Sequence, residues 1–257
     1  MPEGPEIKYI AEVCKTYLIN YKLVKSVGLP QKSKLIDVKS RGKLLVLVFK
    51  DYFLHIHFGL TGWIVFDRDE SKYPKYELTF KKKDKELKIY IDDLRKFSKI
   101  KFLNRKQHKK TLEKLGIDIF SDNFTREYFA SVITNSKKKI VSLLLDQNKF
   151  CGIGNYIKNE SLYIAGIDPH SKASDIDNDK ITELYKAIKF CAFSNFMELI
   201  KENNLEIDKT ELDKIQKEKL EVPYKYRVYG QKVDPVGNRV IRENISGRQT
   251  YYVKEIQ

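Results

Sequence analysis

The chain of 257 residues carries 49 Lys and Arg against 35 Asp and Glu, so its formal net charge at pH 7 is +14. A hydrophobic fraction of 42%, with sixteen Tyr and fourteen Phe, is typical of a globular protein and excludes a disordered one. The basic excess favours a polyanionic partner, most often nucleic acid, and three scattered cysteines without a CxxC pair exclude a disulfide framework and a cysteine zinc site.

The first half of the chain predicts one helix followed by strands. Apolar residues at helical spacing predict a helix over Ile7–Leu18, and Pro5 suits its first turn. The KKKDK run that begins at Lys81 predicts a solvated hairpin loop. Short β-prone runs predict a sandwich or barrel, and they cover Leu44–Phe49, Phe53–Phe58, Trp63–Phe66, Tyr76–Phe80 and Leu87–Ile91.

The second half is predicted to be helical until the last 35 residues. Asp122 or Thr125 is expected to cap the first helix. The end of the chain predicts β structure, with YRVYG, NRVI and QTYYV separated by the turn formers DPVGN and ENISG. The expected helices are Arg126–Val132, Lys139–Asp146, Tyr156–Ile164, Asp179–Phe196 and Ile207–Leu220.

The segment MPEGPEI places acid groups at a helix start. Methionine before Pro2 is usually removed, and the prolyl amine that this leaves titrates near pH ~8, against ~10.4 for lysine. The helix directs its positive end at this amine and disfavours its protonation further. A neutral amine suits Schiff-base chemistry at a sugar C1′, with Glu3 as acid/base and Glu6 stabilising the cationic intermediate. Taken alone, the same residues also fit a plain helix N-terminus.

Several segments resemble, in order, those of the formamidopyrimidine-DNA glycosylase / endonuclease VIII (Fpg/Nei) family. MPEGPEI resembles the family's N-terminus, and SRGKLLVLVF resembles the strand with its catalytic lysine, which falls on Lys43. HIHFGLTGWIVF resembles the segment whose void-filling residue corresponds to Leu60. DDLRKFSKIKFL resembles the segment with the other two intercalating residues, here Arg95 and Phe97. This shared order argues against a chance match.

The resemblance continues into the second half. LGIDIFSDNF resembles the interdomain linker, and LLLDQNKFCGIGNYIKNESLYIAGIDP resembles the helix–two-turn–helix (H2TH), whose GxGN turn holds a phosphate at Gly154 and Asn155. Val141 stands where the family often has a lysine, so the lysines at 137–139 are the candidates for that phosphate contact. Asp146 is expected to cap or orient the H2TH turn.

The resemblance implies an α+β fold in three parts. Residues 1–120 would form an N-terminal catalytic β-sandwich with the N-terminal helix, 125–222 a helical H2TH DNA-binding domain, and 223–257 a C-terminal zincless β-hairpin finger. DNA would bind across a basic cleft, with the damaged base flipped from the duplex. Three side chains suit the space that the flipped base leaves. The apolar Leu60 would fill it, the Arg95 guanidinium would donate hydrogen bonds to the unpaired base, and the Phe97 ring would stack.

The end of the chain departs from family members that close with a four-cysteine zinc finger. Residues 224–257 contain no Cys and no His, which argues against a structural zinc site. The segment resembles the zincless finger of a minority of the family, and Arg248 matches the arginine that reaches a phosphate beside the lesion. Apolar and aromatic packing is expected to hold the hairpin, through Val240, Ile241, Tyr251 and Val253.

His55 and His57 alternate along one expected strand, so both point to one face. No carboxylate or Cys is spaced with them. A structural or DNA-backbone role is therefore preferred over a metal pair.

The resemblance implies a bifunctional DNA glycosylase and AP lyase of base excision repair that needs no metal and no cofactor. Pro2 would attack C1′, expel the base and form an imine, and β,δ-elimination would then cleave the strand, with Glu3 and Lys43 as acid/base groups. The expected partner is double-stranded DNA that contains damaged bases or abasic sites, bound by a monomer. No run of about 18 apolar residues and no signal-peptide pattern occurs, so an intracellular protein is expected, nuclear in a eukaryote or in a replication compartment of a virus.

The substrate class rests on two local features. The RGK segment and the zincless end resemble Nei-like members, which favours oxidised pyrimidines and hydantoins. Two alternatives stay open: an Fpg-like preference for oxidised purines, and a non-catalytic H2TH protein that only binds nucleic acid. The presence of Pro2, Glu3 and Lys43 argues against the non-catalytic alternative.

Overall fold

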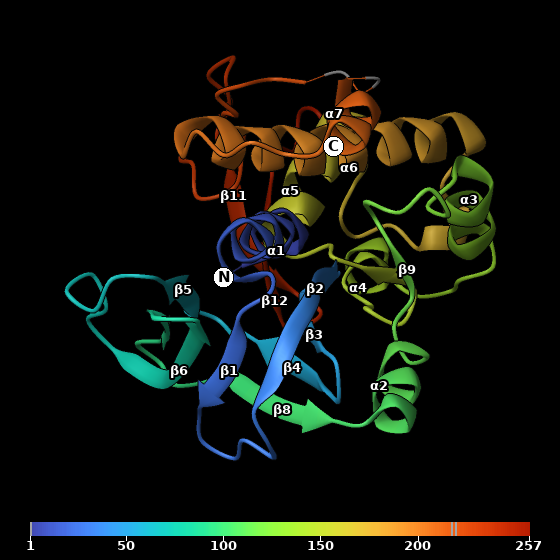
Figure 1. Ribbon diagram of the computed structural model, residues 1–257. Coiled ribbons are helices and arrows are strands. Elements are labelled where there is room, and N and C mark those ends of the chain that lie inside the picture. The colour runs from blue at the N-terminus through green and yellow to red at the C-terminus, as the bar shows by residue number, and fades with distance from the viewer. Residues whose placement is uncertain (1, 217, 219) are drawn as a thin grey trace. The chain divides into compact units, whose positions relative to one another are not determined.

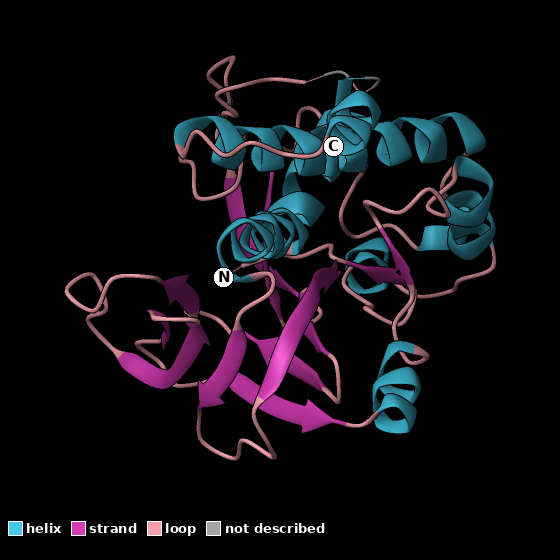
Figure 2. Cartoon of the chain, viewed as in Figure 1, coloured by secondary structure: helices cyan, strands magenta, loops and turns pink. Residues whose placement is uncertain are grey.

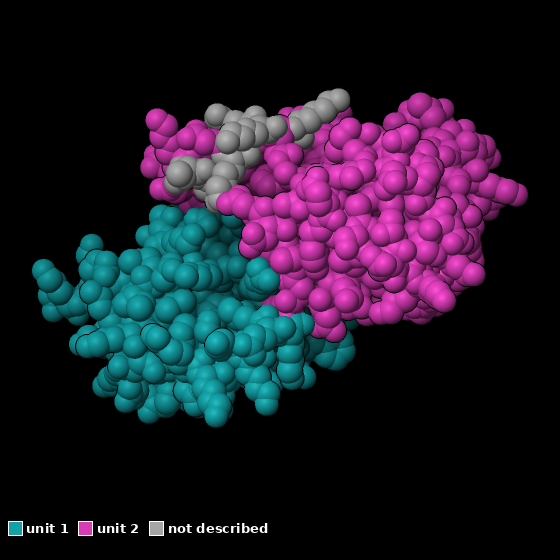
Figure 3. All heavy atoms as spheres, turned by 90° about the vertical axis from the view of Figure 1, so that its right-hand side faces the viewer, with its two compact units in different colours: residues 1–114 teal, residues 115–257 magenta. Residues whose placement is uncertain are grey.

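The computed structural model describes residues 2–216, 218 and 220–257. The chain forms two compact units, Met1–Lys114 and Leu115–Gln257 (Figure 3). The first unit contains the sandwich expected from the N-terminal half, and the second contains the helices and the C-terminal hairpin, which confirms the α+β fold. The finer division into 1–120, 125–222 and 223–257 stays a prediction.

Unit 1 is built on eight antiparallel strands in the order β5-β7-β6-β1-β2-β3-β4-β8 (Figures 1 and 2). β2 pairs with β1 at its beginning and with β3 along the rest of its length, so it joins the two halves of a sandwich. The strands are β1 (Lys22–Lys25), β2 (Ser33–Arg41), β3 (Leu44–Phe49), β4 (Phe53–His57), β5 (Trp63–Val65), β6 (Pro74–Lys82), β7 (Lys85–Asp92) and β8 (Lys99–Leu103).

All five expected strands are present, and the pattern missed β1, β2 and β8. These three strands carry charged residues on their outer face, so their apolar content is too low to stand out. The expected loop in KKKDK is a tight turn at Lys83 and Asp84, because Lys82 pairs with Lys85. Lys83 has a φ of 54°, as such turns require.

Helix α1 (Gly4–Leu18) packs on β2 and β3. It begins three residues earlier than the apolar pattern predicted, and Pro5 lies in its first turn as expected. Its inward face contributes Ile7, Ile10 and Cys14 to the core of unit 1, each at most 3% exposed. This burial ties the beginning of the chain to the sandwich.

Helix α2 (Arg105–Leu112) follows β8 and was not predicted from the sequence. None of its residues is buried, so it has no apolar stripe that periodicity could detect. A capping box closes its start: Gln107 N–H donates to the Asn104 side chain at 2.9 Å, and Asn104 N–H donates to the Gln107 side chain at 3.0 Å.

Unit 2 contains the five helices expected from the sequence, with shifted ends. Thr125 caps the first of them as predicted, its Oγ1 accepting the N–H of Tyr128 at 3.1 Å. The last expected helix reaches to Leu220, and that stretch includes positions 217 and 219, which lie outside the described residues. The elements are β9 (Ile117–Asp118), α3 (Arg126–Thr134), α4 (Ile140–Leu144), β10 (Phe150–Cys151), α5 (Asn155–Ala165), a 3₁₀ turn (Ala173–Asp175), α6 (Asn178–Glu202) and α7 (Lys209–Gln216).

The chain ends in the hairpin of β11 (Ile241–Ile245) and β12 (Arg248–Tyr252). Ser246 and Gly247 form its turn, with φ values of 54° and 76°. ENISG was therefore only partly a turn, since its first three residues lie in β11. YRVYG was predicted to be extended and instead forms turns, because its N–H groups bind a buried carboxylate described below.

Candidate active site

The beginning of the chain is fixed in place. Pro2 is buried, and Glu3 is 1% exposed and caps α1. The Glu3 carboxylate accepts the N–H of Glu6, and the Glu6 carboxylate accepts the N–H of Glu3 at 2.8 Å. Negative groups are stabilised at a helix N-terminus. The two predicted acid groups therefore hold each other next to the predicted nucleophile.

Lys43 lies in the two-residue turn that joins β2 to β3, where Arg41 pairs with Leu44. Lys43 was predicted to lie at the start of a strand, and in the structure it lies one residue before β3 begins. Gly42 has a φ of 55° at the first turn position, which a residue without a side chain adopts readily. Pro2 lies two residues before α1, and Lys43 lies between β2 and β3. Because α1 packs on β2 and β3, both residues adjoin elements that pack together in unit 1.

His57 adds a neutral group near this turn. It lies opposite Leu44 on β3 and Lys99 on β8. Desolvation, together with the positive charges of Lys43 and Lys99, lowers its pKa below the usual 6.5. Its imidazole is therefore neutral at pH 7, and Nδ1 accepts the N–H of Gly59 at 3.1 Å. No catalytic role was predicted for this histidine from the sequence.

The two loops with the predicted intercalating residues are tied together by one buried carboxylate. Asp93 is fully buried and accepts hydrogen bonds from the Thr61 hydroxyl at 2.5 Å, from Ser98 N–H at 2.6 Å and from Arg95 N–H at 3.2 Å. Burial alone would raise the pKa of Asp93, but these hydrogen bonds outweigh it and the pKa is lowered. The carboxylate thus links the loop of Leu60 to the loop of Arg95 and Phe97.

The same two loops are also packed closely at Gly59. A Cβ at this position would lie 2.7 Å from the Cβ of Phe97, and its φ of 66° favours glycine. Phe97 is 55% exposed, and Arg95 is exposed beside it. Leu94 on the same loop is 57% exposed, a further apolar side chain that the family motif did not single out.

Asp93→Ala is expected to reduce binding to a duplex with an abasic-site analogue by at least about tenfold. The lost buried acceptor leaves Ser98 N–H and the Thr61 hydroxyl unpaired, at roughly 1–3 kcal/mol each, while Arg95 N–H keeps only its bond to Thr61 Oγ1. Fluorescence anisotropy measures this directly. Asp92→Ala is the matched control, since Asp92 holds a different turn through Ser71 and Tyr73. Equal losses in both variants would show that the effect is not specific to the intercalating loops.

In unit 2, the turn that is predicted to bind a phosphate lies at the start of α5. Gly154 is the N-cap, and the Asn155 amide donates to the backbone oxygen of Gln249 at 2.9 Å. Lys158 is fully buried and donates to the Asn155 side chain at 3.0 Å and to the Thr250 hydroxyl at 2.9 Å. The turn is therefore fixed to β12, which begins with the exposed predicted phosphate contact Arg248 (Figure 1).

A second buried charge on α5 holds the segment before the hairpin. Glu160 is fully buried, and its carboxylate accepts the backbone N–H groups of Arg227, Val228 and Tyr229 at 2.8, 2.9 and 2.8 Å. The Tyr224 hydroxyl donates to it at 3.1 Å. These bonds replace the strand pairing that YRVYG was expected to make.

A small apolar cluster supports the hairpin. Val228 and Val253 are fully buried in it and Val240 is 8% exposed, with Tyr163 and Tyr251 packed against them. Val240, Val253 and Tyr251 were expected to hold the hairpin. Ile241 was also expected there, but it lies outside the cluster and is half-buried on β11.

The lysines at 137–139 precede α4. Lys138 donates to the Asp146 carboxylate at 2.9 Å, and Asp146 also accepts the N–H of Asn148 at 3.1 Å. Asp146 therefore orients the H2TH turn as predicted. Lys138 forms an ion pair within the protein, so Lys137 and Lys139 are the better candidates for a phosphate contact.

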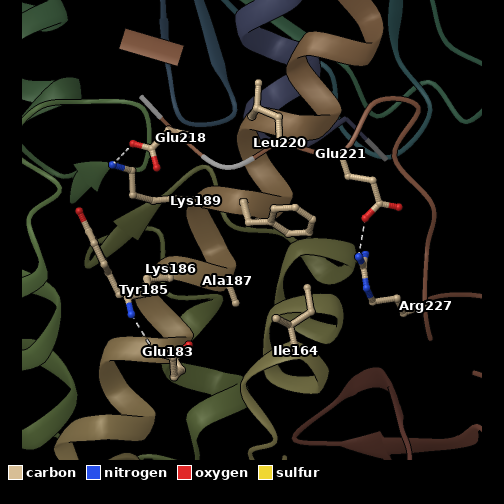
Figure 4. A pocket seen from close by; sticks show the side chains of 11 residues that line it. Ile164, Glu183, Tyr185, Lys186, Ala187, Lys189, Glu218, Leu220, Glu221 and Arg227 are labelled. Carbon is tan, nitrogen blue, oxygen red and sulfur yellow. Dashed lines mark hydrogen bonds and ion pairs between the residues drawn. The ribbon is translucent and has the colours of Figure 1, made fainter. Parts of the chain in front are cut away.

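A cavity of about 730 Å³ lies along α6 in unit 2 (Figure 4). Its basic groups face acids: Lys189 pairs with Glu218, and Arg227 pairs with Glu221 at 2.5 Å. This charge balance does not favour a phosphate site there.

Among residues 2–216, 218 and 220–257, no three His, Cys, Asp or Glu side chains gather closely enough to hold a metal ion. Within the same part of the chain, no helix has the length and apolar content of a membrane span.

Two family domains match the sequence. The N-terminal domain of formamidopyrimidine-DNA glycosylase matches residues 1–100, and the H2TH domain of the same enzyme matches residues 115–212. The formamidopyrimidine-DNA glycosylase of Rickettsia africae is 30% identical over 207 residues, which cover 74% of this chain and 76% of the relative. The chain belongs to the formamidopyrimidine-DNA glycosylase family. The enzyme of Prochlorococcus marinus is 28% identical and is covered over its full length, as is this chain.

Solved structures of the family share the fold. The MutM (Fpg) protein of Thermus thermophilus superposes with a TM-score of 0.79 at 20% identity and covers 100% of this chain and 98% of its own. Lactococcus lactis formamidopyrimidine-DNA glycosylase, bound to DNA with an abasic site, has a TM-score of 0.77 at 20% identity, with 99% of both chains covered.

The candidate site residues were predicted from the motifs of the glycosylase family. The motifs of the family placed Pro2, Lys43, Leu60 and the residues of the second loop. The segment DDLRKFSKIKFL includes Asp93, but no role was predicted for it, because its role depends on contacts between two loops that lie far apart in the sequence.

Proposed function

We propose that this glycosylase excises oxidised pyrimidines and hydantoins through an imine on Pro2, followed by β,δ-elimination. That the chain is a DNA N-glycosylase and AP lyase of base excision repair, acting on damaged or abasic-site DNA, follows from its family. The observation that carries the proposed mechanism is the N-terminal capping box, which holds two carboxylates next to a buried Pro2.

The proposed reaction uses groups of unit 1. The amine of Pro2 attacks C1′, and the bond from C1′ to the base breaks, with the base leaving as its conjugate acid. Glu3 and Lys43 exchange the protons, and Glu6 stabilises the cationic intermediate. The C1′–O4′ bond of the sugar then breaks, O4′ takes a proton, and an iminium forms between Pro2 and C1′. Loss of a C2′ proton from this iminium expels the 3′ phosphate, and a second elimination expels the 5′ phosphate. Water hydrolyses the remaining imine and releases Pro2.

The proposed DNA contacts lie on both units. Leu60, Arg95 and Phe97 would fill the space of the flipped base, since their loops are fixed by Asp93. Gly154 and Asn155 at the start of α5, and Arg248 on β12, would bind phosphates.

The proposed preference for pyrimidines rests on the Nei-like RGK segment and on the zincless end. A structure of the Lactococcus lactis enzyme contains DNA with an oxidised pyrimidine. Another structural relative, a MutM protein, is complexed with DNA that contains 8-oxoguanine, so an Fpg-like preference for oxidised purines remains the second candidate.

We expect single-turnover excision from duplexes with thymine glycol or a hydantoin to be at least about tenfold faster than excision of 8-oxoguanine. A difference of 1.4 kcal/mol in transition-state stabilisation produces this ratio. Gel analysis of cleaved, end-labelled duplexes measures the rates, with an abasic duplex as the lyase control. Faster removal of 8-oxoguanine would replace the proposal with the purine preference.

A further inference from the structure

On one face of the sheet, β2, β4 and β8 carry Lys39, His55 and Lys101, with the apolar Val46 of β3 between them. Residues directly opposite each other in antiparallel strands point to the same face. Lys39 lies opposite Val46, Val46 opposite His55, and His55 opposite Lys101. Lys39 and Lys101 are exposed, so they present positive charge on either side of the His55 ring.

Helix α2 is held against this face by His108. The His108 ring stacks on Phe53 with centroids 3.8 Å apart and planes 2° from parallel, and its Nδ1 lies 2.8 Å from Nε2 of His55. Burial, His108 and Lys101 lower the pKa of His55 to about 4, and burial and Lys39 lower that of His108. Both rings are therefore neutral at pH 7 and anchor the helix without adding charge.

The positive charges of α2 do not stabilise the helix itself. Arg105, Lys106, Lys109 and Lys110 are exposed, and the eight residues of α2 include no acid. Cations in the first turn oppose the helix dipole, and a helix this short does not form alone. Lys109 lies 4.0 Å from Glu113. Within the described chain, Arg105, Lys106 and Lys110 form no ion pair.

The basic helix lies at the strand end opposite the intercalating loops. The loop with Arg95 and Phe97 leads into β8 at Lys99, and α2 follows Leu103 at the other end of β8 (Figure 1). The four steps from Lys99 to Leu103 in the extended strand span about 13 Å. This separates the charged helix from the lesion-reading loops by roughly four base-pair steps.

We propose that α2, with Lys39 and Lys101, is a second DNA-backbone site, which binds an undamaged duplex segment while the intercalating loops hold the damaged one. This inference rests on the proposed function for the damaged duplex. The exposed cations present point charges along about 12 Å of helix, and a duplex of similar length presents several phosphates. A second backbone site would let the enzyme transfer between DNA segments during its search.

The test uses a triple variant, Lys106→Gln, Lys109→Gln and Lys110→Gln, because Gln keeps helix propensity while removing charge. The matched control removes three exposed charges from the β6–β7 turn region, with Lys82→Gln, Lys83→Gln and Lys85→Gln. Energy transfer is measured between a donor-labelled duplex with an abasic-site analogue and a separate, acceptor-labelled undamaged duplex. The salt dependence of binding to the undamaged duplex is measured in parallel.

We expect the wild-type chain and the control to bring the two duplexes together at low salt, and the α2 variant to lose this signal. The salt slope for undamaged DNA should fall by about three in the α2 variant, one for each lost phosphate contact. Binding to the abasic duplex alone should not change.

Three outcomes would overturn the inference: no energy transfer with the wild-type chain, equal losses in the control, or weaker binding of the α2 variant to longer abasic duplexes. The last would show that α2 holds the flank of the damaged duplex. Excision assays on the same samples separate the two proposals, because a chain that bridges duplexes but excises no base would refute only the proposed function.

Discussion

Pro2→Gly is expected to slow the formation of a borohydride-trapped complex with an abasic duplex by about 10²-fold or more. Glycine keeps an α-amino group but loses the secondary amine and the fixed φ that hold the nitrogen in place, and a misplacement of about 1 Å costs a factor of this order. The measurement is single-turnover trapping, with denaturing gels to separate the covalent complex. Intact-mass spectrometry must first show that Met1 is absent from both proteins, because its retention blocks the amine.

Pro5→Ala provides a matched control for this experiment. Pro5 is also a buried proline in the first turn of α1, but it has no free amine. Alanine suits a helix, so the fold and the trapping rate should both be preserved. A peptide map of the wild-type complex should place the link on Pro2. Rapid trapping by Pro2→Gly with the link on a lysine would contradict the proposed nucleophile.

The sequence located much of the fold because local patterns are strong there. Apolar periodicity found α1, and Thr125 was recognisable as a helix cap. Helix α2 could not be found in this way, because a single histidine, His108, rather than an apolar stripe, holds it to its neighbour. Where tertiary contacts replace periodicity, the sequence of a segment does not reveal its structure.

The candidate site shows the same limit. Motif order predicted Lys43 and Leu60 as site residues, whereas no role was predicted for the Asp93 carboxylate that links the two loops. Lys158 and Glu160 look like exposed residues in a polar stretch of sequence, yet both are fully buried. Thr250, which bonds Lys158, and Tyr229, which bonds Glu160, lie more than 60 residues further along the chain. Only the folded chain shows that α5 anchors the hairpin with its charged residues.

Glu160→Ala is expected to be the most destabilising substitution in unit 2. It leaves the N–H groups of Arg227, Val228 and Tyr229 without their acceptor, in a region where water does not reach Glu160 itself. The Tyr224 hydroxyl keeps only its contact with the Cys191 sulfur. An unsatisfied buried donor costs roughly 1–3 kcal/mol, so a total loss of about 3 kcal/mol or more is expected. Urea unfolding measures the loss, and hydrogen exchange locates it.

Hydrogen exchange shows whether Glu160 specifically holds the hairpin segment to α5 or only contributes to the core of unit 2. Amide protection should fall first in residues 224–257. The proposed phosphate contact of Arg248 should weaken too, because Arg248 begins β12, the strand that bonds α5. Glu243→Ala is the control, since Glu243 bonds Tyr252 on the hairpin but is partly exposed, and little change is expected. Uniform loss of protection across unit 2, with the hairpin no more affected than α3, would mean that Glu160 supports the whole unit and does not specifically position the finger.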